Sequence, residues 1–243
     1  MIRVENLSKR FAEIEAVKGV TFEAPDGRIT GLLGPNGAGK TTTLRMISTL
    51  VQPTTGRAMV DGVETGTDPL GVRAKLGLLS DARGLYMRLT ARENIAYYGR
   101  LRGMTSPAIA SSIAKLAQWL DMEALLDRRT DGFSQGERMK VAIARALVHD
   151  PRNVVLDEPT NGLDVMTTRS LREVVRRLRE EGKCVLFSSH VMQEVSALCD
   201  EIVILAHGAV VAVGPPEAIR EASGCTSLED AFVKLAGAEA AEA

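Results

Sequence analysis

Aromatic side chains are scarce in this 243-residue chain, because Phe, Trp and Tyr together make up only 4% of it. Proteins that bind single-stranded nucleic acid stack bases on such rings. The formal net charge is −1, so the chain as a whole offers no basic surface to a phosphate backbone. Both shortages argue against a nucleic-acid partner.

Cysteine is also rare, with three residues at Cys184, Cys199 and Cys225. The number is odd, and the spacings fit no zinc-binding pattern. Cys184 and Cys199 have apolar neighbours in the sequence. We therefore expect reduced, buried thiols of the kind that cytosolic proteins carry, and neither disulfides nor metal ligands.

Long hydrophobic runs are missing as well. No stretch reaches the ~18 apolar residues that a transmembrane helix needs, and the first residues, MIRVENLSKRF, lack the apolar segment of a signal peptide. The longest apolar segment, residues 202–213, is interrupted by His207 and Gly208, which predicts a hairpin of two strands. We expect a cytoplasmic chain that serves a membrane, if at all, through a partner.

The composition that remains suits one large α/β domain, with 45% hydrophobic and 25% charged residues. Short β-rich segments fill residues 2–33, and helical apolar spacing over about 90–147 predicts a helical lobe. Strand and helix patterns alternate again from residue 153, which predicts a largely parallel sheet covered by helices. The Ala- and Glu-rich residues 236–243 are predicted to fray.

A glycine-rich segment carries the clearest chemical signal. It fits the P-loop pattern G-x-x-x-x-G-K-[ST] with Gly34, Pro35, Asn36, Gly37, Ala38, Gly39, Lys40 and Thr41, and Thr42 follows in the predicted helix. Glycines let backbone N–H groups surround phosphates, Lys40 supplies a charge near the β- and γ-phosphates, and the Thr41 hydroxyl reaches Mg²⁺. A chance glycine turn would not need the apolar strand before it and the helix after it. We therefore predict nucleotide binding.

Two carboxylates follow an apolar strand at residues 153–156. Ligands bind beyond the carboxyl ends of strands in open α/β sheets, so Asp157 is expected to face the P-loop and hold Mg²⁺. Glu158 is expected to accept a proton from an attacking water or to polarise it. The alternative is a solvated acidic turn before Pro159, and the presence of the P-loop makes it the weaker interpretation.

With these motifs, the chain resembles the ABC ATPase family. Residues 133–138 look like the family signature, usually Leu-Ser-Gly-Gly-Gln, with Ser134 and Gly136 retained and Gln135 and Glu137 departing from it. The resemblance implies that these four residues contact the nucleotide, because a hydroxyl and backbone amides at a helix N-terminus can bind a γ-phosphate. For Glu137 a second role is open, since it can instead cap the helix that follows.

Further site residues are implied by the resemblance alone. Phe11 matches the aromatic residue that stacks on adenine, although a core position is the alternative. Asp164 ends the loop that touches the opposite subunit, and His190, 32 residues after Glu158, matches the switch histidine at the γ-phosphate. Asp81 stands where the family has a glutamine, so it is either a metal or water ligand or a plain loop residue.

The implied organisation is a single ABC ATPase domain over residues 1–235. It has a P-loop NTPase core with an N-terminal antiparallel β subdomain, at about 1–80 and 147–220, and an inserted α-helical subdomain at about 88–146. ATP and Mg²⁺ are the implied cofactors. Because the chain has one P-loop and one signature, two copies are expected to enclose ATP head to tail, with Lys40, Glu158 and His190 catalytic.

The resemblance also implies a partner. Residues 84–94 and 227–232 resemble exporter ATPases of the ABC-2 group, and residues 141–151 with Ser80 and Asp81 are most similar to sodium-export ATPases of the NatA type. A separate ABC-2 permease is then expected to hold the chain at the inner face of the membrane through residues 81–93 and the helical lobe.

Other functions stay open. Drug-exporting ATPases of the DrrA type share much of this pattern, so antibiotic or lipid export is an alternative to sodium export. A soluble ABC ATPase of chromosome maintenance, DNA repair or translation is the alternative of another class. Only 94 positions separate Lys40 from Ser134, too few for the long coiled coil of the repair types, and translation types carry two ATPase units. A simple P-loop kinase or small-molecule ATPase would not need the signature at Ser134 and Gly136.

Overall fold

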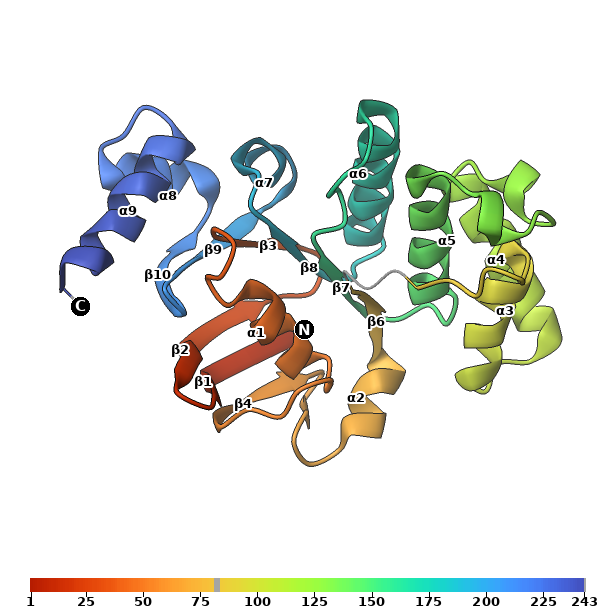
Figure 1. The fold of residues 1–243 in the computed structure, drawn as a ribbon, viewed down its shortest axis with the longest axis horizontal. Helices are drawn as coiled ribbons and strands as arrows, with labels where there is room; N and C mark the ends of the chain where they lie inside the picture. Colours follow the sequence, from red (N-terminus) through yellow and green to blue (C-terminus); the bar gives the residue numbers. More distant parts are fainter. Residues whose placement is uncertain (81–83, 243) are drawn as a thin grey trace.

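Two β-sheets and a helical lobe make up the chain, shown in Figure 1 as a computed structural model. The structure describes residues 1–80 and 84–242. The α/β class, the antiparallel N-terminal sheet and the inserted helices are all as the sequence predicts.

The six-stranded sheet has the order β10-β9-β3-β8-β7-β6. Its strands are β3 (Ile29–Leu33), β6 (Leu76–Leu79), β7 (Asn153–Asp157), β8 (Cys184–Ser189), β9 (Glu201–Ala206) and β10 (Ala209–Gly214). All neighbours pair in parallel except β9 and β10, which form the predicted hairpin. Every residue of β3, β7 and β8 is buried, as is usual for parallel strands covered on both faces.

The second sheet is antiparallel, with the order β2-β1-β4-β5. It consists of β1 (Ile2–Phe11), β2 (Ile14–Ala24), β4 (Thr55–Val60) and β5 (Val63–Glu64). A tight turn at Asp61 and Gly62, both with positive φ, joins β4 to β5.

Helix α1 (Lys40–Ile47) lies between the two sheets (Figure 1). Its Leu44, Met46 and Ile47 are buried in one hydrophobic core with residues of both sheets, among them Val155 of β7. Helix α2 (Pro69–Lys75) leads from β5 to β6. The start of α1, and with it the P-loop, is thereby held between two rigid layers.

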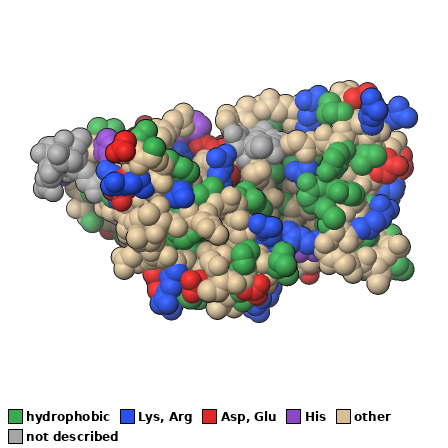
Figure 2. All heavy atoms as spheres, turned by 60° about the horizontal axis from the view of Figure 1, so that its bottom comes forward, with side chains coloured by type: hydrophobic (Ala, Val, Ile, Leu, Met, Phe, Trp, Pro, Cys, Tyr) green, Lys and Arg blue, Asp and Glu red, His purple; other side chains and the backbone are tan. Residues whose placement is uncertain are grey.

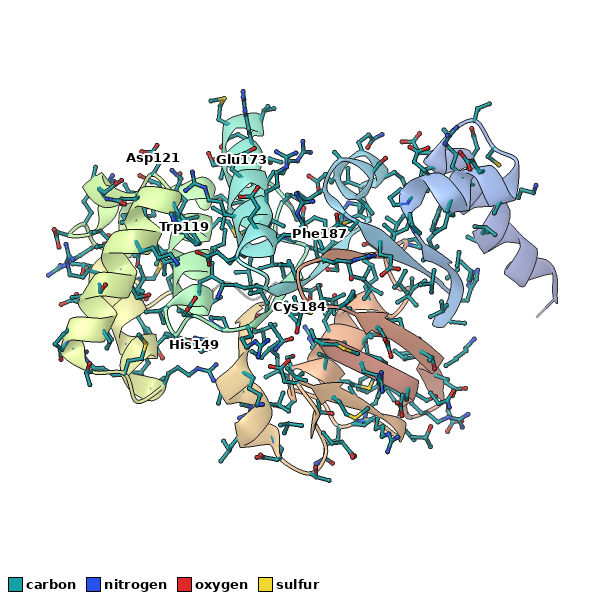
Figure 3. All side chains as sticks on the ribbon, turned by 180° about the vertical axis from the view of Figure 1, so that it is seen from behind. Trp119, Asp121, His149, Glu173, Cys184 and Phe187 are labelled. Atoms are coloured by element: carbon teal, nitrogen blue, oxygen red, sulfur yellow. The ribbon has the colours of Figure 1, made fainter. Side chains whose placement is uncertain are left out.

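A second core covers the other face of the six-stranded sheet. Helices α6 (Val165–Glu180) and α7 (Met192–Leu198) pack there with the helical lobe. Because side chains alternate along a strand, β7 sends Val154 and Leu156 into this core and Val155 into the first. Strand β8 does the same with Phe187 and Cys184, both labelled in Figure 3.

The helical lobe contains α3 (Ala91–Leu101), α4 (Ser106–Trp119) and α5 (Gln135–Leu147), and two short 3-10 turns, at Glu123–Leu125 and Thr130–Gly132, lie between α4 and α5. The predicted helical spacing is confirmed, since Ile113, Leu116 and Ala117 of α4 are all buried. Helix α3 begins with a capping box between Thr90 and Glu93.

Helices α8 (Pro216–Ser223) and α9 (Leu228–Glu242) pack beside β9 and β10. Helix α9 extends over residues 236–242, the segment for which the sequence predicts fraying. Alanine and glutamate, which dominate those residues, have high helix propensity and extend a helix that is already started.

All three cysteines are free thiols, and Cys225 is only half-buried. Burial raises the pKa of the Cys184 thiol to about 12 and raises that of Cys199 as well, so both are inert at neutral pH. Among the described helices, none combines the length and the apolar character needed to cross a bilayer.

Candidate active site

The P-loop runs from the end of β3 into α1 and needs its glycines. Gly37 and Gly39 have φ of 87° and 97°, which side chains rarely adopt. A Cβ on Gly39 would lie 2.6 Å from the Ala16 carbonyl oxygen, and one on Gly34 would lie 2.5 Å from that of Leu205. Gly39 is also the N-cap of α1 and offers no side-chain cap, so the first amides of the helix are left for an anion.

A pocket of about 380 Å³ opens over this loop. Its lining combines P-loop residues with residues that follow β7 and β8: Ala16, Pro35, Asn36, Gly37, Gly39, Lys40, Thr41, Thr42, Glu158, Asn161 and His190. Ala38 is instead buried in the core behind the loop. The structure therefore brings the P-loop, Glu158 and His190 to one place, at the carboxyl ends of three adjacent parallel strands.

Lys40 and Glu158 are the centre of the pocket's polar contacts. The buried Lys40 Nζ donates to the carbonyl oxygens of Gly34 (2.7 Å) and Pro35 (3.1 Å) and lies 3.3 Å from Glu158 Oε1. The other carboxylate oxygen, Oε2, is 2.9 Å from His190 Nδ1. Glu158 has a φ of 45°, an uncommon conformation for a non-glycine residue that the surrounding contacts must hold.

Asp157 stands beside Thr41, as the sequence predicts. Its Oδ1 accepts hydrogen bonds from Thr41 Oγ1 (3.2 Å) and from Ser188 Oγ (2.7 Å). Ser188 Oγ in turn accepts from the Glu158 N–H at 2.9 Å. Sequence reasoning missed Ser188, whose place follows from the register of β7 on β8, where Asp157 and Ser188 are direct partners.

The signature residues lie outside the lining of this pocket in the described part of the chain. Ser134 is the N-cap of α5, and its Oγ accepts from the Glu137 N–H at 3.2 Å. The Glu137 carboxylate accepts from the Ser134 N–H at 2.8 Å and pairs with Arg128 at 3.1 Å. These contacts, the Ser134 N–H first, lower the pKa of Glu137. The structure thus shows Glu137 in the capping role that the sequence left open.

The signature also packs against the loop that follows Glu158. Gln135 Nε2 donates to the Asn161 carbonyl oxygen at 3.2 Å. A Cβ on Gly136 would lie 2.8 Å from Thr167 Oγ1, so this close approach requires glycine. Asp164 caps α6 by accepting from the Thr167 N–H at 2.9 Å, a bond that lowers the pKa of Asp164.

Phe11, the predicted adenine-stacking residue, is not among the described residues that line the pocket. Phe11 ends β1 with its side chain 46% exposed, which excludes the core position, and Lys9 Nζ lies 5.0 Å from the ring centroid. Asp81 lies outside the described residues.

Comparison with known proteins identifies relatives of this chain. The family model "ABC transporter" matches residues 17–161. The chain is 42% identical over 238 residues to the ABC transporter ATP-binding protein NatA of Bacillus subtilis, covering 96% of this chain and 97% of that protein. It is 36% identical over 229 residues to the Nod factor export ATP-binding protein I of Burkholderia lata, covering 94% and 75%.

A solved dimeric ATP-binding cassette, in a post-hydrolysis state with ADP and Pi, superposes with a TM-score of 0.80 at 26% identity. The match covers 88% of this chain and 98% of that one. The chain therefore belongs to the ABC transporter family, as an ATP-binding subunit that hydrolyses ATP.

Proposed function

We propose that this chain powers an export system through separate membrane subunits, and that Lys40, Glu158 and His190 carry out its hydrolysis step. The supporting observation is the row of contacts from Lys40 through Glu158 to His190 at the mouth of the P-loop. A γ-phosphate in the loop attracts Lys40 away from Glu158. The freed carboxylate then orients and deprotonates the attacking water, while His190 steadies the phosphate.

Mg²⁺ is the metal that these residues fit. Thr41 and Asp157 place a hydroxyl and a carboxylate within 3.2 Å of each other, beside the loop that surrounds the phosphates. Mg²⁺ prefers oxygen ligands and takes one or two from the protein, the rest coming from water and phosphates. When bound, it neutralises charge on the phosphates. Ser188 orients Asp157 toward it through their 2.7 Å hydrogen bond.

Two copies are needed to complete each site in this proposal. The signature residues of one chain lie outside its own pocket, so a second chain, placed head to tail, has to supply Ser134 and Gly136 to the γ-phosphate. The similarity to a dimeric cassette supports this arrangement. Phe11, exposed at the end of β1, is the proposed surface for the adenine ring, because none of the described residues that line the pocket is Phe, Tyr or Trp.

A groove of about 350 Å³ between the core and the helical lobe is the proposed permease site. Its polar lining is basic: Arg73, Arg102 and Arg145 contribute guanidinium groups, and no lining residue described is acidic. We call it the arginine groove; its other lining residues are Ser48, Leu50, Leu76, Leu78, Ser80, Tyr98, Ala146 and His149. Lys and Arg side chains gather near the middle of the face shown in Figure 2.

The charges in the arginine groove lack acidic partners within the described chain. Arg73 donates to Thr49, and Arg145 lies 4.5 Å from the Tyr98 ring centroid, but none of the three arginines pairs with a described carboxylate. Burial, followed by the charge of Arg73, lowers the pKa of Arg102. An acidic cytoplasmic segment of an ABC-2 permease complements this surface, which holds the chain at the inner face of the membrane.

The cargo is proposed from resemblance, as sodium, with drug, antibiotic or lipid export as the alternative. The NatA relative and the Nod factor export relative support a transport role over a soluble ABC ATPase without a permease. The described residues bind nucleotide and partner, so the permease selects the cargo. Tandem purification from membranes, with identification of the co-purifying chain, tests this. A lone chain that stays in the soluble fraction when its permease is co-expressed would contradict the proposal.

The hydrolysis step is tested with Glu158→Gln. The variant keeps the shape of the side chain but cannot take the proton, so we expect ATP binding and an ATP-dependent dimer on gel filtration, with turnover at least ~100-fold lower. A variant that turns over ATP normally would remove Glu158 from the mechanism. A chain that stays monomeric with ATP would remove the dimer.

A further inference from the structure

Glu194 is a buried carboxylate that none of the motifs contains. It lies in α7, is 8% exposed, and does not belong to the lining described for the nucleotide pocket. A carboxylate removed from water is costly unless hydrogen bonds compensate it. The hydrogen-bond partners of Glu194 therefore indicate its structural role.

Those contacts join two loops that carry catalytic side chains. Glu194 Oε2 accepts from Thr160 Oγ1 at 2.6 Å and from Ser189 Oγ at 3.3 Å. Thr160 lies two residues after Glu158, and Ser189 directly precedes His190. The first of these bonds is short and charge-assisted, the strong class of hydrogen bond in a protein interior.

The carboxylate is also fixed in place from its own side. Arg172 of α6 lies 4.0 Å from Glu194 Oε1 and balances its charge. Ser189 Oγ accepts from the Val191 N–H at 3.0 Å, which fixes the hydroxyl that Glu194 uses. Glu194, Thr160 and Ser189 are called the Glu194 brace below.

The brace lies behind a contact that has to change during turnover. At the pocket the same two loops meet directly, where His190 Nδ1 is 2.9 Å from Glu158 Oε2. A phosphate and a water between those side chains would push them apart, whereas the buried bonds of the brace need not move. Glu158 also has a φ of 45°, so its conformation depends on how the following loop is held.

We propose that Glu194 is a positioning residue for hydrolysis: its buried carboxylate holds the Glu158 loop and the His190 loop at one spacing, so that both side chains reach the γ-phosphate together. The inference rests on the roles proposed above for Glu158 and His190. In this role Glu194 acts through the two loops that carry Glu158 and His190, to which its contacts with Thr160 and Ser189 connect it.

The same loop is anchored on its other side by the atypical signature. Gln135 Nε2 donates to the Asn161 carbonyl oxygen, and a Cβ on Gly162 would lie only 2.4 Å from that nitrogen. A glycine at position 135 would have no side chain to make this contact. The loop after Glu158 is therefore held between Glu194 and Gln135. This loop connects the Glu194 brace, which serves the chain's own nucleotide pocket, to the signature, which serves the pocket of the second chain.

A double-mutant cycle tests the proposal on the full-length, permease-bound protein. Glu194→Gln keeps the volume but loses the charge, and Thr160→Val removes the hydroxyl at nearly constant shape. For each single variant we expect kcat to fall about tenfold while the KM for ATP stays within about twofold. The double variant should lose no more than Thr160→Val alone, because Glu194→Gln removes the charge from the same hydrogen bond that Thr160→Val abolishes.

Controls separate positioning from folding. Glu173→Gln on the outer face of α6 makes the same chemical change at an exposed site, and should leave kcat unchanged. Glu194→Asp retains the charge and is expected to recover part of the lost kcat. Thermal unfolding of each variant shows whether the fold is intact, and if Glu194→Gln does not fold, Thr160→Val alone decides the question.

The outcomes are distinguishable from those of the proposed function. Normal kcat in Glu194→Gln and Thr160→Val, or losses that simply add in the double variant, would overturn the brace while leaving Glu158 catalytic. Normal turnover in Glu158→Gln would instead overturn the catalytic assignment on which the brace depends. A matched rise in KM with kcat unchanged would place Glu194 in binding and also overturn the positioning role.

Discussion

The N-termini of α1 and α5 differ in what holds their first amide groups. At α1 the N-cap is Gly39, with φ of 97° and no side-chain cap, and the pocket lies directly beyond it. At α5 the N-cap is Ser134, whose hydroxyl and whose capping partner Glu137 already occupy two amide groups. Both helices are expected to face a γ-phosphate, but only the first is open to it within one chain.

This difference suggests that the two helices have different roles in binding ATP. An uncapped, glycine-rich helix start is costly for stability and useful only where an anion replaces the missing cap. A capped start is stable by itself, so α5 can exist before a second chain brings a nucleotide to it. One chain can then bind ATP by itself, whereas closing the site around ATP requires two chains.

The largest expected effect is at the open helix. Lys40→Ala removes the charge that is buried beside the P-loop carbonyls, and we expect ATP affinity to fall about 100-fold or more. Isothermal titration of the isolated chain measures it, with Lys115→Ala on the helical lobe as the control. Equal affinities in both variants would mean that α1 does not hold the phosphates.

A smaller effect is expected at the capped helix, and it should split into two parts. Ser134→Ala should cost about 1 kcal/mol of unfolding free energy through loss of the cap. It should also lower turnover at least tenfold, while the ATP affinity of the monomer stays the same. Chemical denaturation and ATPase assays measure the two parts.

Thr90→Ala is the matched control for Ser134→Ala, because Thr90 and Glu93 form the same capping box at α3. It should reproduce the stability loss without the loss of turnover in the isolated chain. Equal turnover in the two variants would show that Ser134 acts as a cap and nothing more.

An effect of intermediate size is expected from His149, on the pH dependence of the unfolding free energy. It lies where the lobe joins the core, labelled in Figure 3, and lines the arginine groove. Burial and then the charge of Arg102 lower the pKa of His149 to about 4, with the charge of Lys183 also lowering it and that of Asp150 raising it. The native state therefore stays unprotonated at pH values where the unfolded chain, with a pKa near ~6.5, binds a proton.

The sign of the pH effect follows from that difference. The contribution of His149 to stability is fully present above pH ~6.5 and is lost as the pH falls from there toward about 4, on the order of 1 kcal/mol per pH unit. Denaturation at several pH values should show this slope, and His149→Gln should flatten it. His207→Gln, at the exposed turn between β9 and β10, should leave the slope in place. An unchanged slope in His149→Gln would assign it to other groups.

The smallest effect is expected for Glu137→Gln. The amide can still accept the Ser134 N–H, so the cap weakens by only about 0.5 kcal/mol and the exposed pair with Arg128 adds little. Since the pKa of Glu137 is lowered, its contribution is present above the unfolded value near ~4.5 and is lost as the pH falls through the folded value. A loss of turnover as large as that of Ser134→Ala would instead give Glu137 a direct role at the nucleotide.

Much of the site was predictable because its parts are local in sequence. The P-loop is one continuous strand, loop and helix, and two of its glycines, Gly37 and Gly39, have positive φ values. Asp157 and Glu158 directly follow their strand, so their place at the sheet edge also follows from the chain. The signature was found by resemblance, but its capping box was only one of two possibilities until the structure showed it.

Other residues carried no local signal. Ser188 reaches Asp157 because β8 lies beside β7 in a particular register. The three arginines of the groove come from α2, the end of α3 and α5, which no sequence pattern places together. Glu194 looks like an ordinary polar residue of a short helix, and only its burial against Thr160 and Ser189 sets it apart.

By itself the sequence determined which chemistry this chain has, because a P-loop, a carboxylate pair and a signature act through short segments whose geometry is set by neighbouring residues. The tertiary structure alone decided which of these parts meet. It joins Lys40, Glu158 and His190 in one pocket and leaves Ser134 outside that pocket. The uncapped N-terminus of α1 therefore faces the pocket, whereas the capped N-terminus of α5 does not line it. The physical reason is that contacts between distant segments depend on strand order and register. These are set by packing the two faces of the six-stranded sheet into two hydrophobic cores, and no local sequence pattern encodes them.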